Sequence, residues 1–187
     1  DLVLVARDVK RLAERAKFLR GKYKIKVEIV VADLSKNNEL TKVVRRLTNP
    51  KNPVEVLINN AGFGLKKSFL TSKTKDERAL LDVLVTAPMT LSHAVLPFMK
   101  ARNSGRIINV SSVASWIAGG TYSAAKSYVT VFSESLHSEL RGTNIKVTAL
   151  CPGFTHTEFH ARGQMNMNGL PNWLWLEADR VVADAWR

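Results

Sequence analysis

Residues 106–150 read RIINVSSVASWIAGGTYSAAKSYVTVFSESLHSELRGTNIKVTAL. The apolar runs at 106–110 and 145–150 have the length of buried strands, and residues 122–141 between them have the length and apolar spacing of a helix. No hairpin turn joins the two strands, so the helix carries the chain back across the sheet before the second strand begins. The stretch therefore predicts a strand–helix–strand unit with parallel strands.

The same alternation of short apolar runs and helical patterns extends to both ends of the chain. Three more strands are predicted at residues 2–6, 27–32 and 54–58. Further helices are predicted at residues 8–20, 36–47 and 74–102, and from Glu177 onward. Gly21 is expected to end the first of these helices and Ser35 to cap the second. We therefore expect one doubly wound α/β domain over residues 1–187, with a parallel sheet covered on both faces.

The composition is that of a chain that can bury a core. It has 187 residues, of which 45% are hydrophobic, and this excludes a disordered chain. The longest apolar stretch, Leu80–Met99, is broken by Asp82, Pro88 and Ser92, so no membrane span is predicted. Cys151 is the one cysteine, which excludes an internal disulfide and fits a reducing compartment. We expect a cytoplasmic protein.

The formal net charge is +12, and residues 1–53 carry +8 of it. A basic N-terminal part favours binding to nucleic acid, to an acidic protein partner or to a phosphorylated small ligand, or it simply improves solubility. Its lysines and arginines are spread along helical patterns without interleaved aromatic residues, and this favours solubility. No nucleic-acid partner is predicted, and nucleic-acid binding is the weakest of the functional alternatives.

Suggestive side chains follow four of the predicted strands. The carboxyl ends of parallel strands meet at one edge of the sheet, where doubly wound domains bind their ligands. The residues at this edge are Arg7, Asp33 with Leu34, Asn59–Gly62, and Ser111 with Ser112. We expect them to line one binding site.

Tyr122 and Lys126 are four residues apart on a predicted helix, so their side chains share one face. A tyrosine exchanges protons near neutral pH only where a nearby cation favours its phenolate. Lys126 is placed to be that cation. A surface contact is the usual reason for such a pair, but Ser112 before it and Pro152-Gly153 after it favour a catalytic role.

Six motifs together resemble the short-chain dehydrogenase/reductase family over nearly the whole chain. In order they are LVLVAR at 2–7, DLS at 33–35, NNAG at 59–62, NVSS at 109–112, YSAAK at 122–126 and PGFTHT at 152–157. The resemblance implies a Rossmann-like fold and hydride transfer between a nicotinamide cofactor and a carbonyl or alcohol. It also implies that Ser112 orients the substrate, Tyr122 gives or takes its proton, and Lys126 lowers the tyrosine pKa and holds the nicotinamide ribose.

The resemblance also implies the cofactor-binding residues. Asn59, Asn60, Ala61 and Gly62 would line the adenosine side, with Asp33 and Leu34 at the adenine and Pro152, Gly153, Thr155 and Thr157 over the nicotinamide. Arg7 stands where family members that prefer NADP carry a basic residue, and Ala6 leaves no acidic residue to repel a 2′-phosphate. NADP(H) is therefore expected ahead of NAD. A plain surface position is the alternative for Arg7.

The chain departs from the family pattern in three ways. No glycine precedes Gly21, so we expect the family's first strand and its glycine-rich loop to be missing. This leaves the strands at 2–6 and 54–58 without a shared neighbour. The family's last strand is not visible before Arg187 either, so it too is expected to be missing. Leu84 stands where the family has the asparagine of its proton relay. The spacing from Ser112 to Tyr122 is short, so Ser111 is the alternative serine.

Residues 154–176 match the substrate lid of the family. Met165, Met167, Trp173 and Trp175 there predict an apolar substrate, with local packing as the alternative. His156 and His160 do not have zinc-site spacing, so no metal is predicted. The resemblance further implies a homodimer or homotetramer. The leading hypothesis is an NADP(H)-dependent oxidoreductase, and a non-catalytic binding protein or inactive fragment is the alternative.

Overall fold

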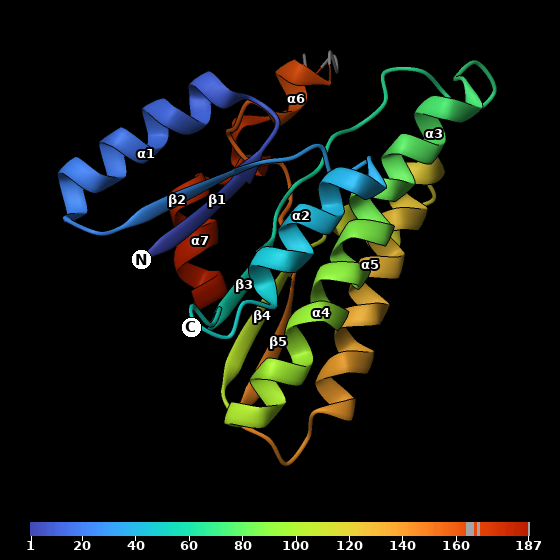
Figure 1. The fold of residues 1–187 in the computed structure, drawn as a ribbon. Coiled ribbons are helices and arrows are strands. Elements are labelled where there is room, and N and C mark those ends of the chain that lie inside the picture. Colours follow the sequence, from blue (N-terminus) through green and yellow to red (C-terminus); the bar gives the residue numbers. More distant parts are fainter. Residues whose placement is uncertain (164–166, 168, 187) are drawn as a thin grey trace.

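The computed structural model describes residues 1–163, 167 and 169–186 (Figure 1). The strands within these residues are β1 (Leu2–Ala6), β2 (Val27–Val31), β3 (Val56–Asn59), β4 (Gly105–Val110) and β5 (Ile145–Leu150). The α-helices are α1 (Val9–Tyr23), α2 (Asn37–Leu47), α3 (Thr74–Leu81), α4 (Ala87–Arg102), α5 (Gly120–Glu139), α6 (Phe159–Arg162) and α7 (Ala178–Trp186). The shorter turns are a π-helical η1 (Asp82–Thr86) and the 3-10 helices η2 (Val113–Trp116) and η3 (Asn172–Leu174).

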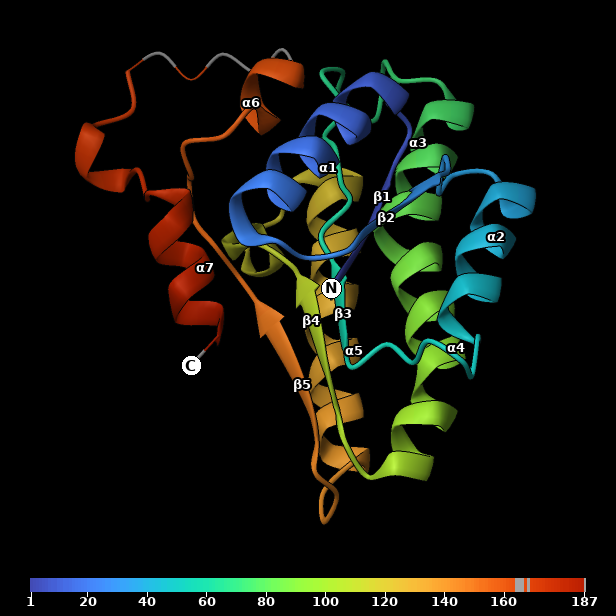
Figure 2. The same ribbon diagram turned by 60° about the vertical axis from the view of Figure 1, so that its left-hand side comes forward.

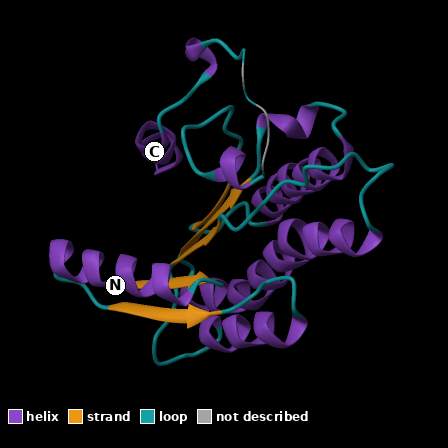
Figure 3. Cartoon of the chain, turned by 90° about the horizontal axis from the view of Figure 1, so that it is seen from above, coloured by secondary structure: helices purple, strands orange, loops and turns teal. Residues whose placement is uncertain are grey.

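All paired strands run parallel, and they form two sheets. One sheet is β1–β2, and the other has the order β3–β4–β5. Figure 3 shows the two groups of strands from above. Helices α2, α4 and α5 lie on one side of the strands, and α1 and α7 lie on the other (Figures 1 and 2). The doubly wound α/β fold is thus confirmed, and β1 and β3 share no hydrogen-bonded ladder, as the sequence predicts.

One apolar core joins the two sheets although no ladder does. Helix α2 places Leu40, Val43 and Leu47 on one face, as the 3.6-residue period requires, and this face is buried. These side chains pack in one cluster with Leu57 of β3 and Ile107 of β4, while Val5 and Val30 of the other sheet pack against the same cluster. Side-chain packing therefore fixes how the sheets sit beside each other.

The helix predicted at residues 74–102 forms as one continuous stretch with a widened turn inside it. At η1 the Ala87 N–H donates to the Asp82 carbonyl, which is the longer π-helical spacing. Pro88 accounts for the widening, because it has no N–H to donate and its ring crowds the carbonyl four residues before it, that of Leu84. Leu84 itself is buried, with 1% of its surface exposed.

This same helix, Thr74–Arg102, is long and apolar enough to cross a membrane, and 44% of its apolar window is buried. Its residues Leu91, Val95 and Met99 belong to the core cluster. The helix therefore serves as a core helix in this fold.

Two helix-boundary expectations are wrong. Helix α1 runs through Gly21 to Tyr23 and ends at Lys24, whose left-handed backbone allows its N–H to donate to the Arg20 carbonyl. Ser35 does not cap α2, because its hydroxyl donates to Asp33 instead. The N-cap of α2 is Lys36, which makes no side-chain capping bond.

Candidate active site

The two adjacent serines that follow β4 face different surroundings. Ser111 is 2% exposed, and its hydroxyl lies 2.8 Å from both the Lys126 carbonyl and the Thr130 hydroxyl of α5. Ser112 instead caps η2 by accepting from the Ala114 N–H, and its hydroxyl lies 3.5 Å from the Pro152 carbonyl. Ser111 therefore joins β4 to α5, and Ser112 is the serine with a hydroxyl available beside Tyr122.

Tyr122 lies in the first turns of α5, packed against an apolar cluster that includes Leu80, Leu84 and Ala125. Burial raises the pKa of its phenol, and the nearby Ser112 hydroxyl lowers it in part. Burial has the larger effect of the two, and the expected lowering of this pKa by Lys126 stays a prediction. At neutral pH the phenol keeps its proton and can donate it.

Lys126 is held under the Tyr122 ring rather than at solvent. Its Nζ donates to the Val110 carbonyl at 2.6 Å and lies 5.7 Å from the centre of the Tyr122 ring. Only 6% of the residue is exposed, and this burial lowers the pKa of the amine to about 8, with a smaller opposing effect of Cys151. The ammonium is fixed by the end of β4, so its position follows from the sheet.

Gly62 brings the chain after β3 close to this lysine. A Cβ added at Gly62 would lie 3.1 Å from Leu84 Cδ2 and 4.0 Å from Lys126 Nζ. A side chain there would therefore crowd Leu84, which makes glycine the residue that fits. Asn60 and Ala61, between β3 and Gly62, are exposed at the same edge.

Asn59 points away from this edge, into the interior. Its amide donates to the Asn109 side-chain oxygen at 2.8 Å and lies 3.3 Å from the Ser92 hydroxyl, and Asn109 donates to Ser133 at 2.9 Å. The resulting buried network ties β3 and β4 to α4 and α5. The Asn59 side chain therefore ties strands to helices in the interior, and its expected place at the adenosine side of a cofactor stays a prediction. Sequence reasoning missed Asn109, although its place in the NVSS motif was a signal.

Arg7 and Asp33 follow β1 and β2, and their side chains lie 3.9 Å apart. The Arg7 side chain is 71% exposed, so most of its guanidinium is available to a ligand. Although burial raises the pKa of Asp33, hydrogen bonds from Ser35 and the charges of Arg7 and Lys36 bring it below its ordinary value. Leu34 is half-buried and packs against the core. These residues are brought together at one strand edge, as predicted.

The segment after β5 begins with the residues expected near a nicotinamide. The Pro152 carbonyl accepts from the Val113 N–H, Thr155 forms a bridge with Leu176, and the Thr157 hydroxyl accepts from the Phe159 N–H. Gly153 lies beside Leu176, whose Cδ1 would be 3.9 Å from an added Cβ. The two ends of segment 154–176 are therefore tied together near β5.

Aromatic side chains fill the base of segment 154–176. Trp175 stacks on His156 at 4.8 Å between ring centres and meets His160 edge-on at 5.2 Å. Trp173 is 80% exposed and Met167 is half-buried, while Met165 lies outside the described residues. Across the part of the chain that the structure describes, no three histidine, cysteine, aspartate or glutamate residues group as metal ligands.

An ion-pair cluster that sequence reasoning missed joins this segment to α1. Arg11 makes two hydrogen bonds to the Glu158 carboxylate, at 2.8 and 2.9 Å, and Arg162 contacts the same carboxylate at 2.7 Å. Arg11 and Glu158 are 147 residues apart and carry no local motif, so no signal pointed to their contact. Glu158 and Arg162 have the i, i+4 spacing of a helical ion pair.

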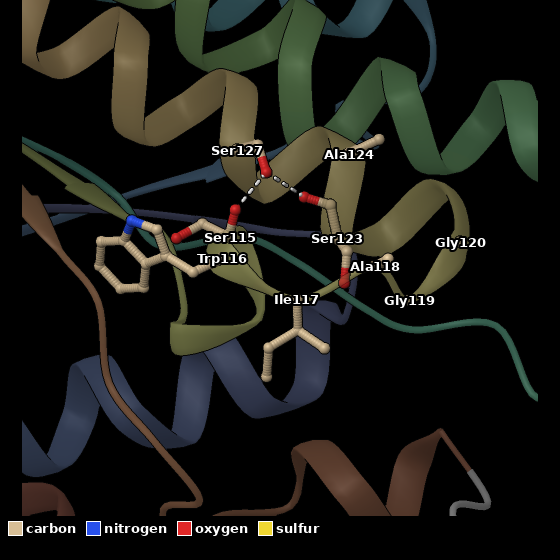
Figure 4. Close-up of a pocket in the computed structure, with 9 residues that line it drawn as sticks. All are labelled: Ser115, Trp116, Ile117, Ala118, Gly119, Gly120, Ser123, Ala124 and Ser127. Atoms are coloured by element: carbon tan, nitrogen blue, oxygen red, sulfur yellow. Dashed lines mark hydrogen bonds between the residues drawn. The ribbon is translucent and has the colours of Figure 1, made fainter.

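The short connection from Ser112 to Tyr122 forms η2 and a glycine turn. Gly120 begins α5 with a φ of +72°, a left-handed conformation that favours glycine. An open hollow of about 560 Å³ lies along this connection. Figure 4 shows Trp116 and Ile117 directed away from α5, while Ser127 bonds to the backbone of Ser115 and Ser123. Although Ser112 and Tyr122 are only ten positions apart in the sequence, the Ser112 hydroxyl still lies beside the Tyr122 phenol.

The family model described as short chain dehydrogenase matches residues 1–167. The chain belongs to the short-chain dehydrogenase family. This short-chain dehydrogenase is 34% identical to a short-chain dehydrogenase from Sphingobium yanoikuyae in complex with NADPH, with a TM-score of 0.93 over 100% of this chain and 73% of that one. It is 30% identical to the bulky-bulky ketone specific alcohol dehydrogenase from Comamonas testosteroni, with a TM-score of 0.87 over 98% and 70% of the two chains.

Curated relatives of this short-chain dehydrogenase are longer than the chain. An NADP-dependent 3-hydroxy acid dehydrogenase of Schizosaccharomyces pombe is 32% identical over 162 residues, which are 84% of this chain and 62% of that protein. An uncharacterized oxidoreductase of Staphylococcus saprophyticus is 31% identical over 159 residues, or 83% and 68%. The matched region thus spans about two thirds of each relative.

Proposed function

We propose that this short-chain dehydrogenase interconverts a carbonyl compound and a secondary alcohol with NADP(H). The observation that carries the proposal is the grouping of the Ser112 hydroxyl, the protonated Tyr122 phenol and the buried Lys126 ammonium at one strand edge. Ser112 hydrogen-bonds the substrate oxygen and orients it. Tyr122 donates its proton to that oxygen as negative charge develops, or accepts it in the reverse direction.

Lys126 acts through charge and position. With a pKa of about 8, its amine is mostly protonated at neutral pH. The ammonium stabilises the phenolate that Tyr122 becomes after it gives up its proton. Because the Val110 carbonyl holds Nζ, this charge stays under the tyrosine ring throughout the reaction.

The residues present fit a dinucleotide phosphate. Gly62 leaves room beside Lys126 where a Cβ would crowd Leu84, and Arg7 offers a mostly exposed guanidinium at the end of β1. A guanidinium pairs well with a 2′-phosphate. When bound, the cofactor supplies the hydride, with Asn60, Ala61, Gly153, Thr155 and Thr157 as the further contacts of the proposed site. The relatives described as NADPH-bound and NADP-dependent support this preference.

The proposal for Tyr122 is tested by Tyr122→Phe in the complete protein. Turnover of carbonyl substrates with NADPH should fall at least about a hundredfold, because the acid is lost, while NADPH affinity changes little. Tyr128→Phe, exposed on the same helix, is the matched control and should keep full turnover. Turnover by Tyr122→Phe at the rate of the control would refute the assignment.

The proposal for Arg7 is tested by Arg7→Ala. The dissociation constant for NADPH should rise about tenfold or more, because a charge-assisted pairing to the 2′-phosphate is lost, and that for NADH should change little. Fluorescence titration of both cofactors measures this. An equal loss for the two cofactors would show that Arg7 does not read the 2′-phosphate.

A non-catalytic cofactor-binding protein is the second candidate. Leu84 favours it, since this buried side chain lies next to Gly62 and cannot hold a proton-relay water through its side chain. NADPH binding without turnover on a broad panel of ketones and aldehydes would support this candidate over the first.

We further propose that segment 154–176 forms a lid over an apolar substrate and that the protein self-associates through α4 and α5. The exposed Trp116, Ile117 and Trp173 support the first point. The exposed Met89 of α4 and Val131 of α5 support the second.

A further inference from the structure

A separate cavity of about 310 Å³ borders Tyr122. It lies between the loop that follows β3, the helix α3 and the start of α5. Leu65, Phe69 and Leu80 form apolar walls. A volume of this size is at the lower end of the range for small-molecule sites, so it suits one part of a ligand.

Glu77 of α3 also lines this cavity, and it is unusually buried for a glutamate, with 8% of its surface exposed. Its Oε1 accepts a hydrogen bond from the Ser72 hydroxyl at 2.5 Å. Its Oε2 is fully buried and has no hydrogen-bond partner. Buried acceptors in proteins are nearly always paired, so a donor is needed here.

Helix capping does not explain why this carboxyl group is buried. An acidic residue in the first turn of a helix is favoured by the helix dipole, and α3 has both Asp76 and Glu77 there. Asp76 provides that charge without lining the cavity. The burial of Glu77 beside Tyr122 therefore has a different use.

We propose that this cavity holds the end of the substrate remote from its carbonyl group, and that Glu77 accepts a hydrogen bond from a hydroxyl on that end. The inference rests on the proposed function, which makes the ligand a carbonyl compound with its reacting group at Tyr122. The substrate class is thus a ketone or aldehyde with an apolar body and a distant hydroxyl.

Lys67 indicates that the group bound by Glu77 is a hydroxyl and not an ammonium group. It lines the same cavity from the loop after β3. A hydroxyl can donate to Glu77 and accept from Lys67 at once, whereas an ammonium has no acceptor and would be repelled by Lys67. The pair therefore selects a neutral group that both donates and accepts.

Two ketones that differ by one hydroxyl test this inference: benzylacetone and its para-hydroxy derivative. Their dissociation constants are measured by calorimetry on the complete protein with NADP⁺, in which no carbonyl reduction occurs. The hydroxylated ketone should bind about tenfold or more tightly, because a site built for a hydroxyl rejects the analogue without it. Glu77→Leu should bring this ratio close to one, because leucine offers the hydroxyl no hydrogen-bonding group.

Controls separate recognition from folding. Asp76→Asn, in the same helical turn, should keep the wild-type ratio. Lys67→Met, at an exposed position, should reduce the ratio in part and serves if Glu77→Leu does not fold. Equal binding of the two ketones by the wild type, or an unchanged ratio in Glu77→Leu, would overturn the inference. A retained ratio without any turnover by NADPH would instead refute the proposed function alone.

Discussion

Lys126 is the residue whose environment most changes its chemistry. The helical spacing from Tyr122 puts the two side chains on one face, but it says nothing of the Val110 carbonyl that fixes Nζ or of the burial around it. These two features come from β4, and they lower the lysine pKa to about 8. The charge of this residue therefore responds to pH well below the ordinary lysine value of 10.5.

The stability of the protein should depend on Lys126 in a defined pH window. Because the folded pKa is about 8 and the ordinary value is 10.5, the unfolded chain binds the proton more tightly, and stability rises as pH increases from about 8 to 10.5. In Lys126→Met this rise is absent. The difference in unfolding free energy between the two proteins should change by about 3 kcal/mol across the window, in favour of the wild type at high pH.

Urea unfolding at a series of pH values measures this difference. Lys100→Met is the control, because Lys100 is exposed and its loss should leave the pH profile of the wild type. A difference between wild type and Lys126→Met that stays constant from pH 7 to about 11 would contradict the buried, shifted lysine.

For single residues, the sequence predicted which side chains come together better than it predicted the direction in which each side chain points. Ser112, Tyr122 and Lys126 come together as predicted because strand ends and helix faces follow from simple periodicity. The inward orientation of the Asn59 side chain could not be predicted, since it depends on partners such as Asn109, which come from other elements. Glu77 gave no signal because a first-turn acid is ordinary in any helix.

Among the elements, α6 and the segment around it depend on α1. The carboxylate of Glu158 is shared by Arg11 and Arg162, and all three side chains are at least half exposed. Exposed ion pairs contribute about 0–1 kcal/mol each. That is too little to affect global unfolding, but it is comparable to the free energy of opening a surface segment.

Glu158→Gln should therefore loosen segment 154–176 without unfolding the protein. Chymotrypsin should cut at Trp173, which is already exposed, several times faster than in the wild type, while the unfolding free energy changes by less than about 1 kcal/mol. Glu14→Gln, exposed on the same α1, is the control. Equal cutting rates in wild type and Glu158→Gln would show that the cluster does not hold the segment.

Element boundaries were predicted well for strands and less well for helices. Strand limits follow from apolar runs that end at polar or glycine residues, and those of β1, β4 and β5 agree to within one residue. The π-helical turn η1 was missed, although Pro88 marked it, because the effect of a proline on the preceding turn is not visible in hydrophobic periodicity.

At the scale of the whole molecule, the two sheets formed by the described residues share one core but differ in burial. In β4, Ile107, Ile108 and Asn109 are each at most 3% exposed, whereas no residue of β1 is fully buried. Local stability follows burial and contact density, so the two sheets should open at different free energies.

In a protein of these 187 residues, we expect backbone amides of β1 and β2 to exchange with solvent at least about tenfold faster than those of β4. Hydrogen exchange followed by mass spectrometry resolves the two sheets. Matching protection of both sheets would mean that the shared core couples them into one unfolding unit.

The arrangement of β4, α5 and β5 has a consequence for inheritance. One contiguous stretch contains Ser112, Tyr122, Lys126 and Pro152, whereas Arg7 and Asp33 follow the first two strands. A single crossover between two related genes, falling anywhere from residue 37 to residue 104, would exchange Arg7 and Asp33 without changing the residues of the later stretch. Under the proposed roles, cofactor choice and reactive chemistry can therefore evolve separately, and chimaeras joined within that interval offer a direct way to recombine them.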